Sequence, residues 1–149
     1  MVWQIQHEGV MLSGLGEQAL LAVSPTAFFA SRQCSGMAIR AAMDWALEQA
    51  RTRQCVISGF HSPLEQSVLH LLLQARSPVI VVLARALESA RLPADWKEAI
   101  AEDRMAVLSG CTEAQRLTSA LAAQRNDLAV ELAERIVIAH ASLGGELLR

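Results

Sequence analysis

The stretch CVISGFHSPLEQSVLHLLLQARSPVIVVL, from Cys55 to Leu83, decides the fold class of this chain. Its first apolar residues end at Ser58-Gly59 and predict a short buried strand. Ser62-Pro63-Leu64-Glu65 predicts the start of a helix, because Ser62 and Glu65 form a capping box and proline fits the first helical position. The continuous run Val79 to Leu83 predicts a strand that is covered on both faces. Together these residues form one β-α-β unit.

The same alternation extends in both directions along the chain. Further strands are predicted at Thr26 to Ser31, at Met105 to Leu108 and at Arg135 to Ala139. Further helices are predicted at 36–50, near 95–101, in two pieces between 113 and 134, and as one turn before Arg149. Strands that alternate with helices predict an α/β fold with a mostly parallel sheet and helices on both faces. The first twenty-odd residues are expected to be an appendage to this sheet.

Length, composition and charge exclude several classes of protein. The 149 residues are 52% hydrophobic, which suits one domain over 1–149 with a sizeable core. A net charge of −2 argues against a broadly basic nucleic-acid-coating surface but leaves room for a local basic pocket. Three distant cysteines (Cys34, Cys55 and Cys111) indicate neither a disulfide framework nor a zinc ribbon. No secretory signal or membrane-spanning stretch is evident, so we expect a cytoplasmic protein without a membrane partner.

High apolar content in a short chain also predicts self-association. The leucine-rich stretch from Leu69 to Leu73 is the stripe expected to be exposed for a second copy, although it would serve equally well as internal core. We expect a homo-oligomer, most simply a dimer.

Small and basic residues follow the predicted strands. They occur at Ser31-Arg32, Ser58-Gly59-Phe60, Ser109-Gly110 and 142–145. Carboxyl ends of parallel strands meet at one edge of a sheet, where small residues let backbone amides approach a phosphate. Serine and glycine are also ordinary turn residues, so turn chemistry alone explains each site. Arg32 adds a fork-shaped donor suited to phosphate, and Arg125-Asn126-Asp127 is predicted to begin the helix before the last strand.

Specific signals for catalysis are weak in the sequence. No G-x-x-x-x-G-K-[ST], G-x-G-x-x-G or G-x-S-x-G motif occurs. The four histidines form no metal-ligand spacing with the cysteines, so no metal or other cofactor is predicted. His140, which follows a predicted strand, is the one histidine near the expected crevice. With no general base or nucleophile in evidence, a binding protein is favoured over an enzyme.

The order of these segments resembles the DNA-processing protein A family (DprA, also called Smf). FFASR at 28–32 is similar to the family's strand ending in Gly-Ser-Arg, and VISGFHSPLEQ at 56–66 is similar to its Val-Ser-Gly strand and loop. VIVVL at 79–83 and AVLSG at 106–110 resemble its next strands. LPADW at 92–96 is a loose counterpart of its Tyr-Pro segment, and QRNDLAVELAERIVIAHASLGG at 124–145 resembles its Arg-Asn-Arg stretch.

The resemblance implies a Rossmann-like three-layer sandwich that takes single-stranded DNA or a nucleotide phosphate at the strand-end crevice. The residues that it implies for this site are Ser31, Arg32, Ser58, Gly59, Phe60, Arg125, Asn126, Gly144 and Gly145. The chain departs from the family at Ala30, which replaces glycine, and at Asp127, which replaces the second arginine. Two other classes stay open. One is a nucleotide hydrolase of the related phosphoribohydrolases, to which Leu143-Gly144-Gly145-Glu146 bears a partial likeness, and the other is a scaffold without a ligand.

Overall fold

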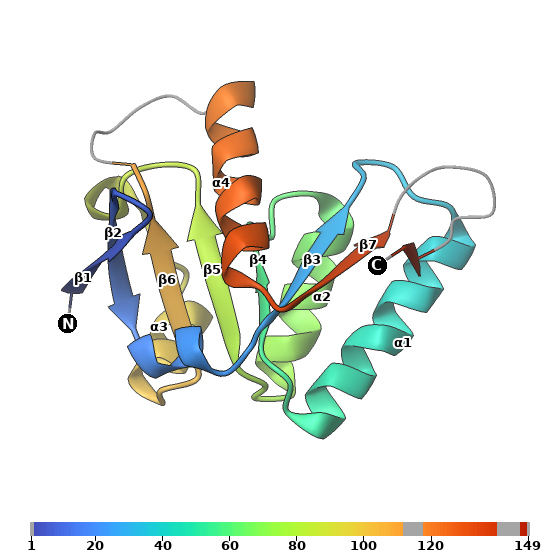
Figure 1. The fold of residues 1–149 in the computed structure, drawn as a ribbon. Helices are drawn as coiled ribbons and strands as arrows, with labels where there is room; N and C mark the ends of the chain where they lie inside the picture. Colours follow the sequence, from blue (N-terminus) through green and yellow to red (C-terminus); the bar gives the residue numbers. More distant parts are fainter. Residues whose placement is uncertain (1, 112–117, 140–146, 149) are drawn as a thin grey trace.

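The computed structural model describes residues 2–111, 118–139 and 147–148, and its centre is one mixed sheet (Figure 1). The strands are β1 (Val2–His7), β2 (Val10–Gly16), β3 (Thr26–Ala30), β4 (Val56–Ser58), β5 (Val79–Leu83), β6 (Met105–Ser109), β7 (Arg135–Ala139) and β8 (Leu147–Leu148). Their order in space is β1-β2-β6-β5-β4-β3-β7-β8. The five strands from β6 to β7 are parallel, whereas β1, β2 and β8 pair antiparallel at the two edges.

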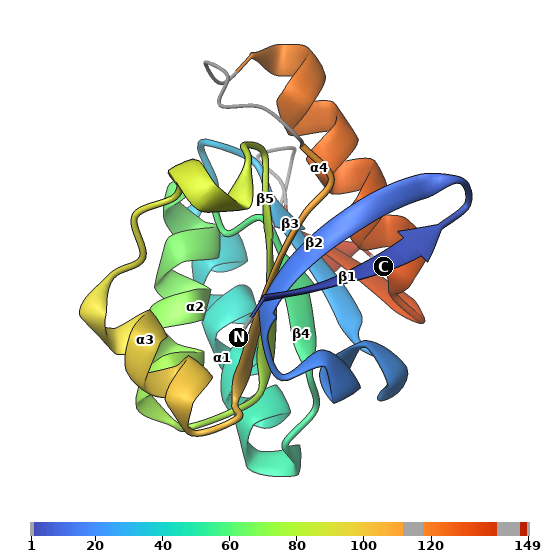
Figure 2. The same ribbon diagram turned by 90° about the vertical axis from the view of Figure 1, so that its left-hand side faces the viewer.

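Helices cover both faces of this sheet. The helices α1 (Gly36–Thr52), α2 (Pro63–Gln74) and α3 (Ala94–Ala101) lie on one side, and α4 (Ser119–Leu132) lies on the other (Figure 2). Short 3-10 helices occupy Gln18–Ala22 and Leu87–Ser89. The predicted α/β fold, a Rossmann-like three-layer sandwich with a mostly parallel sheet, is confirmed. Within the described residues, no helix combines the length and apolar character that crossing a bilayer requires.

Alternate side chains of the central strands supply two separate cores. Phe28, Val56, Val79, Val81 and Val107 face the layer of α1, α2 and α3. Ala27, Ile57, Ile80, Val82 and Ala106 face α4. A strand that is buried on both faces needs a continuous apolar run, which is why VIVVL in β5 is entirely buried. Phe28 also stacks on Trp45 of α1, with ring centroids 5.1 Å apart.

Residues 2–16 form two strands of the sheet and are not an appendage to it. Strands β1 and β2 form a hairpin whose turn residues, Glu8 and Gly9, both have positive φ angles of 49° and 81°. Such turns match the right-handed twist of paired strands. β2 then pairs with β6, with Ser13 opposite Ser109. The ring of Trp3 lies on Gly14, and its Nε1 donates a hydrogen bond to the Gly16 carbonyl at 3.0 Å.

Three predictions about local structure are wrong. Arg125 lies in the middle of α4, not at the beginning of a helix, because Thr118 caps this helix through Leu121 N. The chain end forms β8 beside β7 where a helical turn was predicted. Leu69, Leu72 and Leu73 are buried in the core beneath α2, so the stretch from Leu69 to Leu73 is not an exposed stripe.

Candidate functional site

The path of the chain brings α4 over the carboxyl ends of the central strands. From β3 the chain steps through β4 and β5 to β6, always with its helices on the same face. It then returns through α4, across the other face, to β7 on the far side of β3. α4 packs on β4 and β5 during this return. The point where strand order reverses is the usual ligand position in open α/β sheets.

Glu65 ties together the loops that follow β3 and β4. Its carboxylate is buried and accepts hydrogen bonds from three backbone N–H groups: Ala30 at 2.9 Å, His61 at 2.8 Å and Ser62 at 3.2 Å. The Ser62 contact belongs to the capping box predicted from the sequence, which is confirmed. The Ala30 contact reaches from α2 to the end of the neighbouring strand. One side chain therefore fixes the spacing of two strand ends.

Arg125 lies against Gly59, just beyond the end of β4. A Cβ atom at position 59 would come within 2.5 Å of Arg125 Cδ and Nη1, so only glycine leaves room for this side chain. Arg125 is buried, and its Nε donates to Asn126 Oδ1 at 2.7 Å. Burial lowers the pKa of Arg125, while the nearby charge of Glu65 acts in the opposite direction. Among residues 2–111, 118–139 and 147–148, no carboxylate forms an ion pair with it.

A cavity of about 260 Å³ opens beside Arg125 at the carboxyl ends of β4 and β5. Its walls carry two arginines, a histidine and two aromatic side chains. The lining residues are Gly59, Phe60, His61, Val82, Leu83, Ala84, Arg85, Trp96 and Arg125. No carboxylate from the described part of the chain lines it. We call this the basic cavity.

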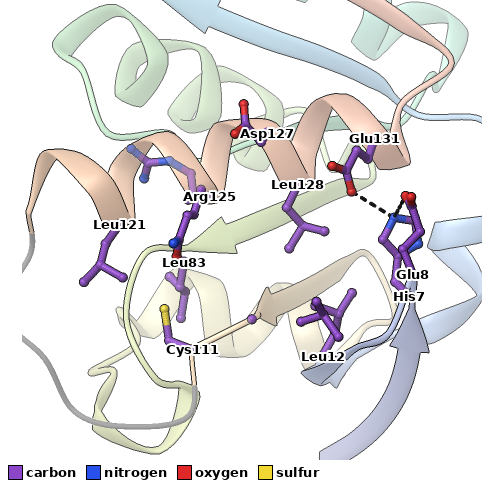
Figure 3. A pocket seen from close by; sticks show the side chains of 13 residues that line it. His7, Glu8, Leu12, Leu83, Cys111, Leu121, Arg125, Asp127, Leu128 and Glu131 are labelled. Carbon is purple, nitrogen blue, oxygen red and sulfur yellow. Dashed lines mark hydrogen bonds and ion pairs between the residues drawn. The ribbon is translucent and has the colours of Figure 1, made fainter.

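A second cavity, of about 500 Å³, lies on the other side of Arg125, between α4 and the β1–β2 hairpin (Figure 3). Its floor is apolar, with Leu12, Leu83 and Leu128, and its rim carries acidic groups. The remaining lining residues are His7, Glu8, Val10, Gly110, Cys111, Leu121, Gln124, Arg125, Asp127 and Glu131. We call this the acidic cavity. The Arg125 side chain lines both cavities. Charged groups at the first cavity are arginines, whereas those at the second are mainly carboxylates.

Backbone amides after β4 are already used inside the protein. The Phe60 N–H donates to Ser58 Oγ at 3.0 Å, and those of His61 and Ser62 donate to Glu65. Phe60 holds a left-handed φ of 49°, which is uncommon for a bulky residue. An anion in the basic cavity would therefore meet arginine side chains rather than these three amides.

The structure brings together part of the site that the sequence predicts. Gly59, Phe60 and Arg125 line the basic cavity, Ser58 is buried and accepts the Phe60 N–H, and Asn126 accepts a hydrogen bond from Arg125. The Ser31 N–H donates to the Ala139 carbonyl of β7 at 2.9 Å. Gly144, Gly145 and His140 lie outside the described residues.

Arg32 is placed differently from Arg125. It is exposed two residues after β3, forms no ion pair among the described residues and lines neither cavity. It therefore stands at the strand-end edge without a surface salt bridge.

Sequence reasoning missed Arg85 and Trp96. Arg85 follows β5 in the way that Arg32 follows β3, so the rule that selected Arg32 would have found it. Trp96 belongs to α3, and only the packing of that helix brings its ring to the cavity.

The sequence matches one protein family, and solved structures share the fold. The family described as DNA recombination-mediator protein A matches residues 1–147. No curated protein matches the chain. DNA processing protein A from Helicobacter pylori, whose structure concerns a single-stranded DNA binding mode, has a TM-score of 0.71 at 17% identity, over 97% of this chain and 71% of that one. DNA processing protein A from Streptococcus pneumoniae has a TM-score of 0.72 at 20% identity, over 95% of this chain and 50% of that one.

Proposed function

Because the chain belongs to the DNA recombination-mediator protein A family, we propose that it binds single-stranded DNA at the carboxyl edge of its sheet, through the basic cavity. The observation that carries this proposal is the lining of that cavity: Arg85 and Arg125 beside Phe60 and Trp96, with no carboxylate from the described residues. Proteins that bind single strands combine cations for the phosphates with aromatic rings on which bases stack. The basic cavity offers both groups within one hollow.

Arg125 is suited to hold a phosphate. Burial has already removed much of the water from its guanidinium, and no carboxylate pairs with it in the described part of the chain. A charge-assisted, two-pronged contact to phosphate is stronger in such surroundings than at an exposed site. Gly59 and Asn126 hold the side chain in place before any ligand arrives, which lowers the entropy cost of binding.

Two exposed arginines extend this positive edge. Arg32 follows β3 and Arg85 follows β5, with β4 between them. Neighbouring strands lie about 4.8 Å apart, so these two strand ends are separated by about 10 Å. A single strand that crosses the edge would therefore meet Arg32, Arg125 and Arg85 with successive parts of its backbone. With about three phosphate contacts, the logarithm of affinity should fall with the logarithm of salt at a slope near −2.

Fluorescence anisotropy with a labelled oligothymidylate tests this proposal at low salt. We expect Arg125→Met and Arg85→Ala each to weaken binding by about tenfold to a hundredfold, the loss of one charge-assisted contact. Arg51→Ala is the matched control, because it removes the same charge from the last turn of α1, before β4 begins. Duplex DNA and a mononucleotide are the comparison ligands.

Three results would contradict the proposal. They are absence of saturable binding to the single strand, equal losses in Arg51→Ala and Arg125→Met, or tighter binding of the mononucleotide than of the oligonucleotide. The last result would favour a nucleotide-phosphate site in the same cavity.

A further inference from the structure

Outside the basic cavity, a histidine lies between two carboxylates. His7 Nε2 is 3.0 Å from Glu8 Oε2 and 3.1 Å from Glu131 Oε1 (Figure 3). His7 ends β1, Glu8 begins the hairpin turn, and Glu131 belongs to the C-terminal half of α4. The group lies at the rim of the acidic cavity, away from Arg85 and Trp96 of the basic cavity. The DNA-binding proposal does not use it.

Two separate features of the fold bring these three side chains together: the turn of the β1–β2 hairpin and the packing of α4. The two-residue turn fixes Glu8 beside His7, because its left-handed backbone closes the hairpin with His7 opposite Val10. The packing of α4 over the sheet then brings Glu131 to the same ring nitrogen, although 124 positions separate it from His7. The cluster is therefore a product of tertiary structure and not of local sequence.

The donors and their spacing suit a metal ion. One ligand atom from each residue can be chosen so that all three lie within 4.8 Å of one another. Imidazole nitrogen and carboxylate oxygen bind Zn²⁺ at about 2.0–2.2 Å, which gives neighbouring ligands a separation of about 3.3 Å in a tetrahedron. The two observed contacts to Nε2, at 3.0 and 3.1 Å, are close to this separation.

Neither carboxylate has another polar partner in the part of the chain that the structure describes. The two carboxylates thus converge on one histidine, and their oxygen atoms keep lone pairs that no other group of the described residues uses. A divalent cation would neutralise the negative charge of both carboxylates. The side chains are also accessible from solvent, at 25% for His7, 71% for Glu8 and 48% for Glu131, so an ion has an entry path.

We propose that His7, Glu8 and Glu131 form a binding site for a divalent ion of the zinc class. Three protein ligands leave at least one coordination position for water, at the rim of the acidic cavity. The bound ion would join the β1–β2 hairpin to α4. Because it binds the folded chain through residues that are far apart in the unfolded chain, it should stabilise the native state.

Calorimetric titration of the chelator-treated full chain with Zn²⁺ alone tests the site. We expect one saturable site and a rise in the thermal midpoint on addition of Zn²⁺. His7→Ala and Glu131→Gln should each weaken binding at least about tenfold and remove most of the thermal shift. Glu131→Gln keeps the size of an exposed side chain, so the variant retains its fold. With Co²⁺, the visible spectrum should show nitrogen and oxygen ligation without a thiolate band.

Two controls separate this site from adventitious binding. His70→Ala removes an exposed histidine on α2, and Cys111→Ser removes the thiol that lines the acidic cavity. Both variants should bind Zn²⁺ like the wild type. The proposal is overturned if the wild type shows no saturable binding, if binding survives His7→Ala and Glu131→Gln, or if it is lost in Cys111→Ser with a thiolate band in the Co²⁺ spectrum.

Discussion

Gly59 and Arg125 are in contact at the carboxyl edge of the sheet. The Arg125 side chain fits in its present position because residue 59 has no side chain. The guanidinium occupies the space that any side chain at position 59 would fill, at 2.5 Å from a Cβ atom there. Gly59 comes from the loop after β4, and Arg125 comes from the helix that covers the opposite face from α2. The basic cavity is lined from both outer layers, by Trp96 of α3 on one face of the sheet and by Arg125 of α4 on the other.

Gly59→Ala is expected to weaken DNA binding without unfolding the protein. The atoms that a methyl group would meet belong to the far end of a flexible side chain, so Arg125 would move and the backbone would stay. We expect the affinity for single-stranded DNA to fall by about tenfold, with the free energy of unfolding changed by about 1 kcal/mol or less. Anisotropy and urea denaturation measure the two quantities.

Gly36→Ala is the matched control for that substitution. Gly36 is the first residue of α1, and a Cβ atom there meets nothing within 4 Å. Its affinity for DNA should equal that of the wild type. A large stability loss in Gly59→Ala, with DNA affinity unchanged, would show that the contact serves packing alone.

Glu65→Gln should destabilise the fold strongly for an isosteric change. The amide offers one acceptor oxygen and one NH₂ donor group where three backbone N–H groups now meet a carboxylate. Because a buried donor left without an acceptor costs about 1–3 kcal/mol, we expect a loss of about 2–3 kcal/mol in urea denaturation. Glu48→Gln, which alters an exposed partner of Arg51, should leave the stability close to that of the wild type.

Arg32→Ala is expected to lower the affinity for single-stranded DNA by about tenfold to a hundredfold, if the strand crosses the edge as proposed. Arg32→Lys should recover only part of this loss, because an ammonium group cannot form the two-pronged contact of a guanidinium. Titration calorimetry at low salt measures both. Equal affinity in the wild type and Arg32→Ala would limit the site to Arg85 and Arg125.

The pKa of Cys55 makes stability depend on alkaline pH. Burial raises the pKa of this thiol from 9.0 to about 12. Between these values the unfolded thiol loses its proton and the native thiol keeps it, so the unfolded state binds fewer protons and stability falls as pH rises. We expect a loss of up to about 1.4 kcal/mol per pH unit between pH 9 and 11.

Urea denaturation under reducing conditions measures this dependence. Cys55→Ala should remove the alkaline slope that Cys55 contributes, whereas Cys34→Ala should retain it because Cys55 is still present. The same slope in the wild type and in Cys55→Ala would assign the effect to other groups.

Self-association stays a prediction, but the surface through which we expect it differs from the one predicted from the sequence. Leu69, Leu72 and Leu73 are buried, which leaves the groove between α1 and α2 as the exposed apolar feature nearest to the predicted stripe. Leu47 is 56% exposed there and lies with Leu71 along the groove. We expect Leu47→Lys to give a monomer by sedimentation, whereas Val23→Lys, at another exposed apolar position, should not. A wild-type monomer at high protein concentration would rule out the association.

Much of the central sheet is predictable from sequence because its signals are local. The strand from Val79 to Leu83 needs no partner to be recognised, since a run of five apolar residues, four of them β-branched, is typical of a strand buried on both faces. The start of α2 is equally local, since Ser62, Pro63 and Glu65 occupy adjacent positions of one turn. Strand-end residues such as Gly59 then follow from the direction of the strands.

Other features depend on contacts that no window of sequence contains. Strand β1 alternates between exposed and half-buried residues, but its half-buried apolar face consists of Trp3 and Ile5 alone, which is too short a pattern to identify a strand. Its place in the sheet depends on Trp3, which needs the small Gly14 opposite it. The position of Arg125 against Gly59 depends on the return path of α4, and a charge pattern cannot show such a path.

The central position of β3 has a consequence for the order of folding. Thr26 pairs with Val56 on one side and with Arg135 on the other, so the middle of the sheet joins early and late parts of the chain. The long segment of chain between β3 and β7 must be brought together before these two strands can pair, and this loop closure makes their pairing slow. On the ribosome, a nascent chain that has not yet released α4 would expose Ile57, Ile80 and Val82 to water. The basic cavity would therefore be completed only after α4 has been synthesised, and a half-synthesised chain would be prone to aggregation until then.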